Sequence, residues 1–241
     1  MHALLPLRRP CRLRWLAAAA ALLALLPLLA TAQVDGSAPA PLRNAAPPAH
    51  KLADVPYGAD RRQRLDVYLP NAPAAPAAPS AAGPTAPRSA AAPVLLMVHG
   101  GAWSMGDKAH VRVVDEKVAR WVPRGWVVVS ANYRLLPAAD VLQQARDVAS
   151  ALAFVQRSAT QWGADASRVV LMGHSAGAHL AALVSTSPVH AQQAGAGPWL
   201  GIVALDSAAL DVPALMQARH AAFYDGVFGA DPAFWRAASP A

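Results

Sequence analysis

Cysteine is almost absent from this chain, which contains a single one, Cys11, among 241 residues. Cys11 lies within the first 32 residues, so residues 33–241 contain no thiol. A disulfide, a cysteine nucleophile and a thiolate metal site are therefore excluded for that part of the chain. Cys11 also precedes the long apolar run, which is the wrong place for a lipid-attachment cysteine. We expect neither a metal nor a cofactor.

Acidic residues are also few, 14 against 21 Lys and Arg, which gives a formal net charge of +7. Four of the basic residues are Arg8, Arg9, Arg12 and Arg14, and the same segment has no acidic residue. Without it, 17 basic and 14 acidic residues remain, a net charge of +3. So small an excess gives no reason to expect nucleic acid as a partner.

Only one long hydrophobic run is present, from Leu16 to Leu29. The arginines before it and Ala30-Thr31-Ala32 after it complete the pattern of a secretory signal peptide over residues 1–32. The alternative is an uncleaved membrane anchor, but the small residues at the end favour cleavage. We therefore expect a secreted or periplasmic protein with no stable membrane insertion.

Composition divides the remaining chain. Residues 33–50 are rich in Pro and Ala and are expected to be a leader. We expect residues 51–241 to form one domain, interrupted by a low-complexity Pro/Ala loop over 70–93 that cannot bury enough apolar surface to order itself.

From residue 94 apolar runs and helical stripes alternate, which predicts an α/β fold with a mostly parallel sheet and helices on both faces. The expected strands are 94–98, 126–130, 169–172 and 200–205, and the expected helices are 111–121 and 139–162. The first of these strands is apolar throughout, as a central strand buried on both faces would be.

The pentapeptide Gly173-His174-Ser175-Ala176-Gly177 stands between an expected strand and a helix-forming run. In that context G-x-S-x-G predicts a nucleophile elbow, in which Ser175 sits on a sharp turn with its hydroxyl exposed. The helix that begins at Ala176 directs backbone N–H groups and the positive end of its dipole toward an oxyanion.

A second motif, His99-Gly100-Gly101-Ala102-Trp103, directly follows the strand over 94–98. Adjacent glycines allow backbone N–H groups to approach a substrate oxygen closely. Taken alone, the motif would more often be a Gly-Gly turn beside a buried Trp, but its place before the elbow favours an oxyanion loop.

Together these motifs resemble the α/β-hydrolase esterases, in particular the branch related to hormone-sensitive lipase whose oxyanion loop reads HGGxW. The resemblance covers about residues 52–241. Further matching segments are Tyr57-Gly58, Arg64 to Pro70, Asn132 to Leu135 and Gly163-Ala164-Asp165. It implies an α/β-hydrolase fold that opens with short antiparallel strands at 55–57 and 64–69.

The resemblance also implies a reaction: hydrolysis of small or medium acyl esters through an acyl-enzyme, with no cofactor and a small-molecule ester as the partner. Ser175 would be the nucleophile. The oxyanion hole would consist of the N–H groups of Gly101, Ala102 and Ala176, with Gly100 shaping the turn. The oligomeric state stays open.

The acid and the base of a catalytic triad are missing from the pattern. In this fold they follow the nucleophile, acid first and then His, and in the family both lie beyond the next two strands. No strand-like run follows Leu205. We therefore expect the last strands and both triad residues to be absent and the chain to be incomplete at its C-terminus.

The histidines at hand are weak substitutes. His179 is expected to project down the elbow helix in a structural role, and His174 to pack within the elbow. Asp211 and His220 have the right order but no strand between them to place either one, so they stay a minor candidate pair.

The segment 211–236 is expected to form helices that begin at Pro213 and Pro232. Its aromatic residues either line an acyl pocket or pack the segment onto the sheet.

Two alternative functions remain. An arylformamidase-like amide hydrolase would carry the same HGGxW loop, although the signal peptide argues against it. A non-catalytic, truncated relic would lack the triad acid and His.

Overall fold

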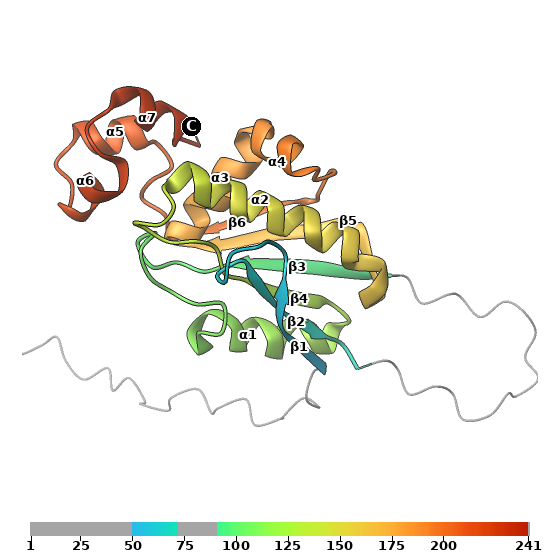
Figure 1. Ribbon diagram of the computed structural model, residues 1–241. Coiled ribbons are helices and arrows are strands. Elements are labelled where there is room, and N and C mark those ends of the chain that lie inside the picture. Colours follow the sequence, from blue (N-terminus) through green and yellow to red (C-terminus); the bar gives the residue numbers. More distant parts are fainter. Residues whose placement is uncertain (1–49, 72–90, 241) are drawn as a thin grey trace, which may run out of the picture. The chain divides into compact units, whose positions relative to one another are not determined.

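The computed structural model describes residues 50–71 and 91–240 (Figure 1). The predicted signal peptide and nearly all of the predicted leader and low-complexity loop lie outside these residues. The ends of the predicted leader and loop differ from the structure: His50 already belongs to the first strand, and Ala92 and Pro93 belong to the third. No helix in the described ranges is long and apolar enough to cross a bilayer.

Six strands form one sheet in the order β1-β2-β4-β3-β5-β6. Their bounds are β1 His50–Pro56, β2 Arg64–Leu69, β3 Ala92–Val98, β4 Val127–Ala131, β5 Ala164–His174 and β6 Gly201–Leu205. Strands β4, β3, β5 and β6 run parallel, whereas β1 and β2 pair antiparallel with their neighbours. The predicted α/β-hydrolase fold, with its mostly parallel sheet and antiparallel opening strands, is confirmed.

The helices follow the predicted rhythm. Their bounds are α1 Val111–Trp121, α2 Val141–Ser158, α3 Ala176–Thr186, α4 Pro188–Ala194, α5 Val212–Gln217, α6 Phe223–Phe228 and α7 Pro232–Ala237, with 3-10 turns at Val122–Arg124 and Ala159–Trp162. The helix predicted over 139–162 is α2 and the 3-10 turn that follows it. Asp140 and Gln143 form a reciprocal capping box that starts α2.

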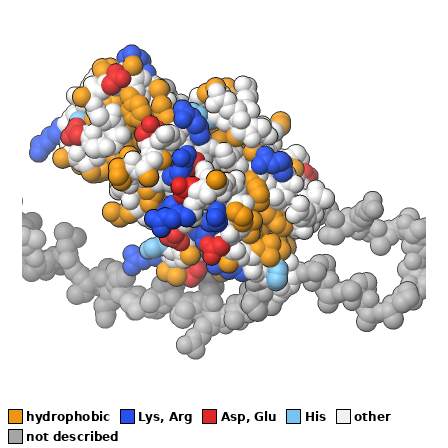
Figure 2. Space-filling view, viewed as in Figure 1, with side chains coloured by type: hydrophobic (Ala, Val, Ile, Leu, Met, Phe, Trp, Pro, Cys, Tyr) orange, Lys and Arg blue, Asp and Glu red, His pale blue; other side chains and the backbone are white. Residues whose placement is uncertain are grey.

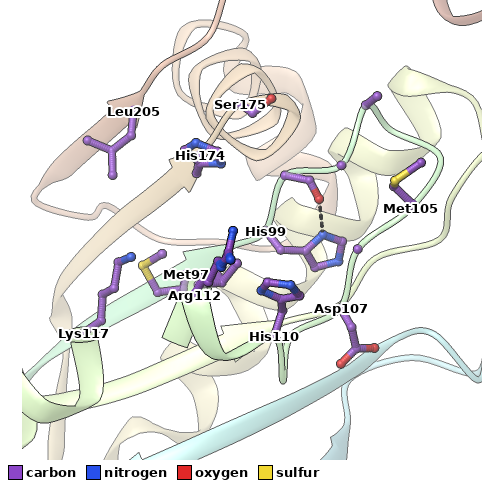
Figure 3. Close-up of a pocket in the computed structure, with 15 residues that line it drawn as sticks. Met97, His99, Met105, Asp107, His110, Arg112, Lys117, His174, Ser175 and Leu205 are labelled. Atoms are coloured by element: carbon purple, nitrogen blue, oxygen red, sulfur yellow. Dashed lines mark hydrogen bonds between the residues drawn. The ribbon is translucent and has the colours of Figure 1, made fainter. Parts of the chain in front are cut away.

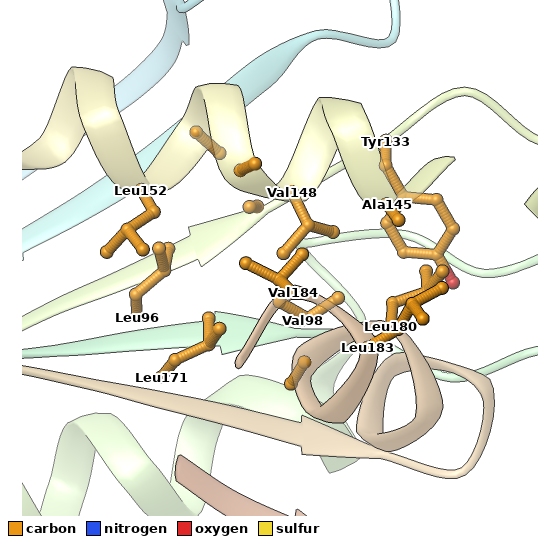
Figure 4. Close-up of a cluster of buried hydrophobic side chains, with 14 of the residues drawn as sticks. Leu96, Val98, Tyr133, Ala145, Val148, Leu152, Leu171, Leu180, Leu183 and Val184 are labelled. Atoms are coloured by element: carbon orange, nitrogen blue, oxygen red, sulfur yellow. The ribbon is translucent and has the colours of Figure 1, made fainter. Parts of the chain in front are cut away.

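Strand β3 lies at the centre of the sheet and is buried on both faces. Leu96 and Val98 point to the face covered by α2 and α3, whereas Leu95 and Met97 belong to the smaller cluster on the α1 face. Figure 4 shows the larger core, in which side chains of β3 and β5 meet those of the two helices. Helices therefore cover both faces, as predicted (Figure 1).

Charged side chains of both signs lie close together on the face shown in Figure 2. An ion pair joins Arg134 to the buried Asp147 of α2, whose carboxylate accepts from Nε and Nη2 of Arg134 at 2.8 and 2.7 Å. Gln63 Nε2 donates to the same carboxylate at 2.8 Å. A buried carboxylate that accepts these three hydrogen bonds is held in one place.

We predict that Gly177→Ala destabilises the fold. An alanine Cβ at position 177 would lie 2.3 Å from the Val98 carbonyl oxygen and 2.5 Å from that of His99, so backbone must shift. We expect a loss of about 2 kcal/mol in the free energy of unfolding, measured by urea denaturation. The matched control is Gly226→Ala in α6, where nothing lies within 4 Å and the helix should be unaffected or slightly stabilised. Equal effects of the two substitutions would contradict this account.

Candidate active site

Ser175 occupies the turn between β5 and α3. Its φ of 54° and ψ of −120° lie in a region that residues other than glycine rarely adopt. Such a conformation persists only when its surroundings hold it. The Ser175 N–H donates to the carbonyl of Leu205 at 2.8 Å, which ties the turn to the end of β6.

Close backbone approach explains the glycines around the serine. A Cβ on Gly173 would lie 2.1 Å from the carbonyl oxygen of Gly177. A Cβ on Gly100 would lie 2.8 Å from the carbonyl oxygen of His174 and 3.0 Å from the Ser175 Cβ. The end of β3 therefore lies directly against the serine. Gly100 was predicted to shape the turn; its absent side chain makes room for the serine.

The turn itself belongs to the next three residues. Gly101, Ala102 and Trp103 have φ angles of 122°, 47° and 57°. The Gly101 carbonyl accepts from the N–H groups of Ser104 and Met105 at 3.1 and 2.9 Å. Within the described ranges, the N–H groups of Gly101, Ala102 and Ala176 donate to no acceptor. These donors are thus available to an oxygen of a ligand.

His99 orients the first peptide of this loop. Its ring Nδ1 lies 2.8 Å from the carbonyl oxygen of Gly100, to which it donates (Figure 3). Because a trans peptide points its N–H opposite to its C=O, this bond turns the Gly101 N–H away from His99. The ring stacks on Tyr133 at a centroid distance of 4.5 Å, and its Nε2 has no partner in the described part of the chain.

Polar contacts from the sheet hold the far end of the loop. Asn132 accepts from the Lys108 N–H at 2.6 Å and donates to Asp107 at 2.8 Å. The buried Lys108 ammonium contacts Asp66 at 2.7 Å and Asp54 at 2.8 Å. Asp107 therefore helps to hold the loop in shape.

A cavity of about 690 Å³ opens beside Ser175. One wall is the loop over residues 99–107, which we call the oxyanion loop after its predicted role. His110, Arg112 and Lys117 line the cavity from the side of α1 (Figure 3). His174, predicted to pack within the elbow, is instead exposed and lines this cavity, because its position on β5 faces the sheet side that α1 only partly covers. Nothing in the sequence pattern identified His110, Arg112 or Lys117 as residues of the cavity.

The candidate base residues do not converge on Ser175. His179 is buried in α3, as predicted, and His190 is buried in α4. Asp211 caps α5, and His220 pairs with Asp225 at 3.0 Å, so the minor candidate pair makes only local contacts. Across residues 50–71 and 91–240, no imidazole forms a hydrogen bond with the hydroxyl of Ser175.

Two aromatic residues of the last helices pack against the loop and do not line the cavity. Tyr224 and Phe228 lie against Trp103, with centroid distances of 6.1 and 5.2 Å. Neither residue borders the space beside Ser175. Of the two alternatives for this segment, the structure shows packing, and the surface it packs on is the oxyanion loop and α3.

Comparisons with known proteins agree with this geometry. A family model described as BD-FAE matches residues 84–203. Isoprenylcysteine alpha-carbonyl methylesterase ICME of Arabidopsis thaliana is 32% identical over 128 residues, which are 53% of this chain and 26% of that protein. Esterase LipQ of Mycobacterium tuberculosis is 33% identical over 140 residues, 58% of this chain and 30% of LipQ.

Among solved structures, esterase B from Lactobacillus Rhamnosis (HN001) is similar with a TM-score of 0.57 and 27% identity. The match covers 80% of this chain and 60% of esterase B. The chain thus spans less than a third of the two curated relatives and about three fifths of this structural neighbour.

We predict that acid lowers the free energy of unfolding through buried histidines, at a higher pH than that at which it breaks the carboxylate contacts. Burial lowers the pKa of both His99 and His179 from 6.5 to about 4. The unfolded chain therefore binds more protons than the folded one between about pH 4 and 6.5, so the free energy of unfolding falls as the pH drops through that window. Each ring contributes up to about 1.4 kcal/mol per pH unit. Urea denaturation at pH 7, 6 and 5 measures the slope.

The variant His179→Gln should reduce this slope, because it removes one of the buried rings. Burial also lowers the pKa of His190, which contributes to the slope that remains. The control His50→Gln replaces an exposed ring on β1 and should leave the slope as it is. A slope that both variants share with the parent protein would contradict the assignment to the buried rings.

Proposed function

Because this chain belongs to the α/β-hydrolase esterases related to hormone-sensitive lipase, we propose that it is a serine hydrolase of carboxylic esters with small or medium acyl groups. The observation that carries the proposal is the position of Ser175: a left-handed turn beside a cavity, next to three backbone N–H groups that have no acceptor among the described residues. The names of the relatives, a methylesterase and an esterase, agree with an ester as the substrate.

In the proposed reaction the Ser175 hydroxyl oxygen attacks the ester carbonyl carbon and gives its proton to a base. The carbonyl oxygen becomes an oxyanion, which accepts hydrogen bonds from the N–H groups of Gly101, Ala102 and Ala176. The bond to the alcohol oxygen then breaks, the alcohol leaves with the proton, and water hydrolyses the resulting acyl-enzyme. Gly100 allows the loop to approach the serine without a clash.

The described residues do not supply a base for this reaction. No described imidazole bonds to Ser175, so a second candidate, a non-catalytic protein with the esterase fold, is favoured by one observation. The two candidates differ in the reactivity of the serine, because an unactivated hydroxyl is a poor nucleophile.

A fluorophosphonate probe separates the two candidates. It phosphonylates an activated serine with loss of fluoride, so we expect mass spectrometry to find one label, on Ser175, and hydrolysis of p-nitrophenyl butyrate at a measurable rate. Ser175→Ala should abolish labelling and reduce turnover by at least about a thousandfold. A folded protein that neither labels nor hydrolyses the ester would support the non-catalytic candidate instead.

We also propose that the protein is exported. The support is the basic, apolar and small-residue pattern of residues 1–32. N-terminal sequencing of protein recovered outside the cytoplasm should begin at Gln33. Recovery of an unprocessed chain that starts at Met1 would argue for the membrane-anchor alternative.

A further inference from the structure

His179 is a polar side chain in one of the most apolar parts of the protein. It lies one helical turn after Ser175, is 0% exposed, and has Ala and Leu as its neighbours in α3. A leucine or phenylalanine would fill such a position without the free-energy cost of burying a polar ring. The hydrogen bonds of the ring therefore need an explanation.

Both ring nitrogens are bonded, and they bond to different parts of the chain. Nδ1 lies 3.2 Å from Nε1 of Trp103 in the oxyanion loop. Nε2 lies 2.8 Å from the carbonyl oxygen of Ala238, at the end of α7. An indole nitrogen can only donate and a carbonyl can only accept, so Nδ1 is the acceptor and Nε2 carries the proton. The two bonds thus fix one tautomer.

Trp103 is the residue through which this tautomer acts on the loop. Its side chain is 3% exposed, and its ring meets those of His179 and Phe228 edge-on at 5.3 and 5.2 Å. The backbone of Trp103 and of Ala102 before it is left-handed, a conformation that is unfavourable for residues with a Cβ atom. The anchored indole acts together with the hydrogen bonds that the Trp103 carbonyl accepts from the Leu136 N–H and from Gln144 Nε2, both at 3.0 Å. These contacts hold a strained backbone beside the N–H groups of the loop.

The Ala238 contact links this anchor to the last three helices. Phe228 of α6 is buried against both Trp103 and His179, and the hydroxyl of Ser239 accepts from the N–H of Val212 at the start of α5. When these helices are docked, the Ala238 carbonyl keeps the proton on Nε2 and leaves the Nδ1 lone pair free for Trp103.

The geometry points to His179 as a positioning residue that couples docking of the segment 206–240 to the shape of the oxyanion loop. Its backbone N–H bonds to the Ser175 carbonyl within the helix, but among the described residues its ring bonds only to Trp103 and Ala238 and acts through Trp103. Its effect on catalysis rests on the proposed function, whereas its effect on the loop can be measured without any turnover.

The test compares three variants of the full chain. His179→Phe keeps an aromatic ring but removes both hydrogen bonds. His179→Gln can restore them, because its amide oxygen can accept from Trp103 and its NH₂ group can donate to Ala238. His190→Phe is the control, because His190 is also buried but lies on α4, which packs on α2 and α3.

The first readout is the indole N–H signal of Trp103 in ¹⁵N-resolved NMR spectra, identified as the signal lost in Trp103→Phe. We expect it to be protected from hydrogen exchange in the parent protein, in His179→Gln and in His190→Phe, and to exchange at least about tenfold faster in His179→Phe. Unchanged protection in a folded His179→Phe protein would overturn the inference, whether or not the chain is an enzyme.

The second readout is the rate of fluorophosphonate labelling at Ser175. A displaced oxyanion loop should slow it by about 10- to 100-fold in His179→Phe, with recovery to within about threefold in His179→Gln. A role in stability alone would lower the melting temperature but leave the labelling rate of the folded protein unchanged, which would overturn the inference. If the parent protein does not label at all, the proposed function fails and the NMR readout alone decides.

Discussion

The candidate site depends on one steric constraint, the close approach of three backbone segments at the ends of β3 and β5 and the start of α3. Gly177 admits the carbonyls of Val98 and His99, and Gly173 admits that of Gly177. Gly100 brings the oxyanion loop against Ser175 in the same way. Because β3 and β5 are neighbours in the sheet, their carboxyl ends meet there without any further folding of the loops. The serine and the free N–H groups are neighbours for this reason.

The loop beside the serine has little regular structure of its own and takes its shape from what surrounds it. His99 holds the Gly100 carbonyl, Trp103 is anchored between α3 and α6, and Lys108 and Asn132 fix the return to α1. Each contact reaches a different element. A loop with left-handed residues in its middle needs such distributed support, since the backbone alone would favour another conformation.

The parts of the structure that the sequence predicted are those encoded by neighbouring residues. Apolar runs marked β3 to β6, helical spacing marked α1 and α2, and G-x-S-x-G marked the turn at Ser175. Contacts between distant segments leave no such periodic signal. The indole of Trp103 bonds to a ring 76 positions away, and the cavity residues Arg112 and Lys117 lie on a helix whose pattern revealed only its buried side. The prediction that His174 packs within the elbow was wrong for the same reason, because the packing of all the helices together decides which face of the sheet stays open.

The two halves of the site, the turn at Ser175 and the oxyanion loop, are attached to strands that differ in local stability. The Ser175 N–H donates to the Leu205 carbonyl at the end of β6. β6 is the last strand in the order of the described sheet, and its side chains are exposed or only half-buried, whereas the oxyanion loop continues from the central β3. Strands at an edge open more often than strands in a core. On heating, the turn at the serine should therefore loosen while the loop and the rest of the sheet are still folded, so that the geometry of the site is lost before the fold.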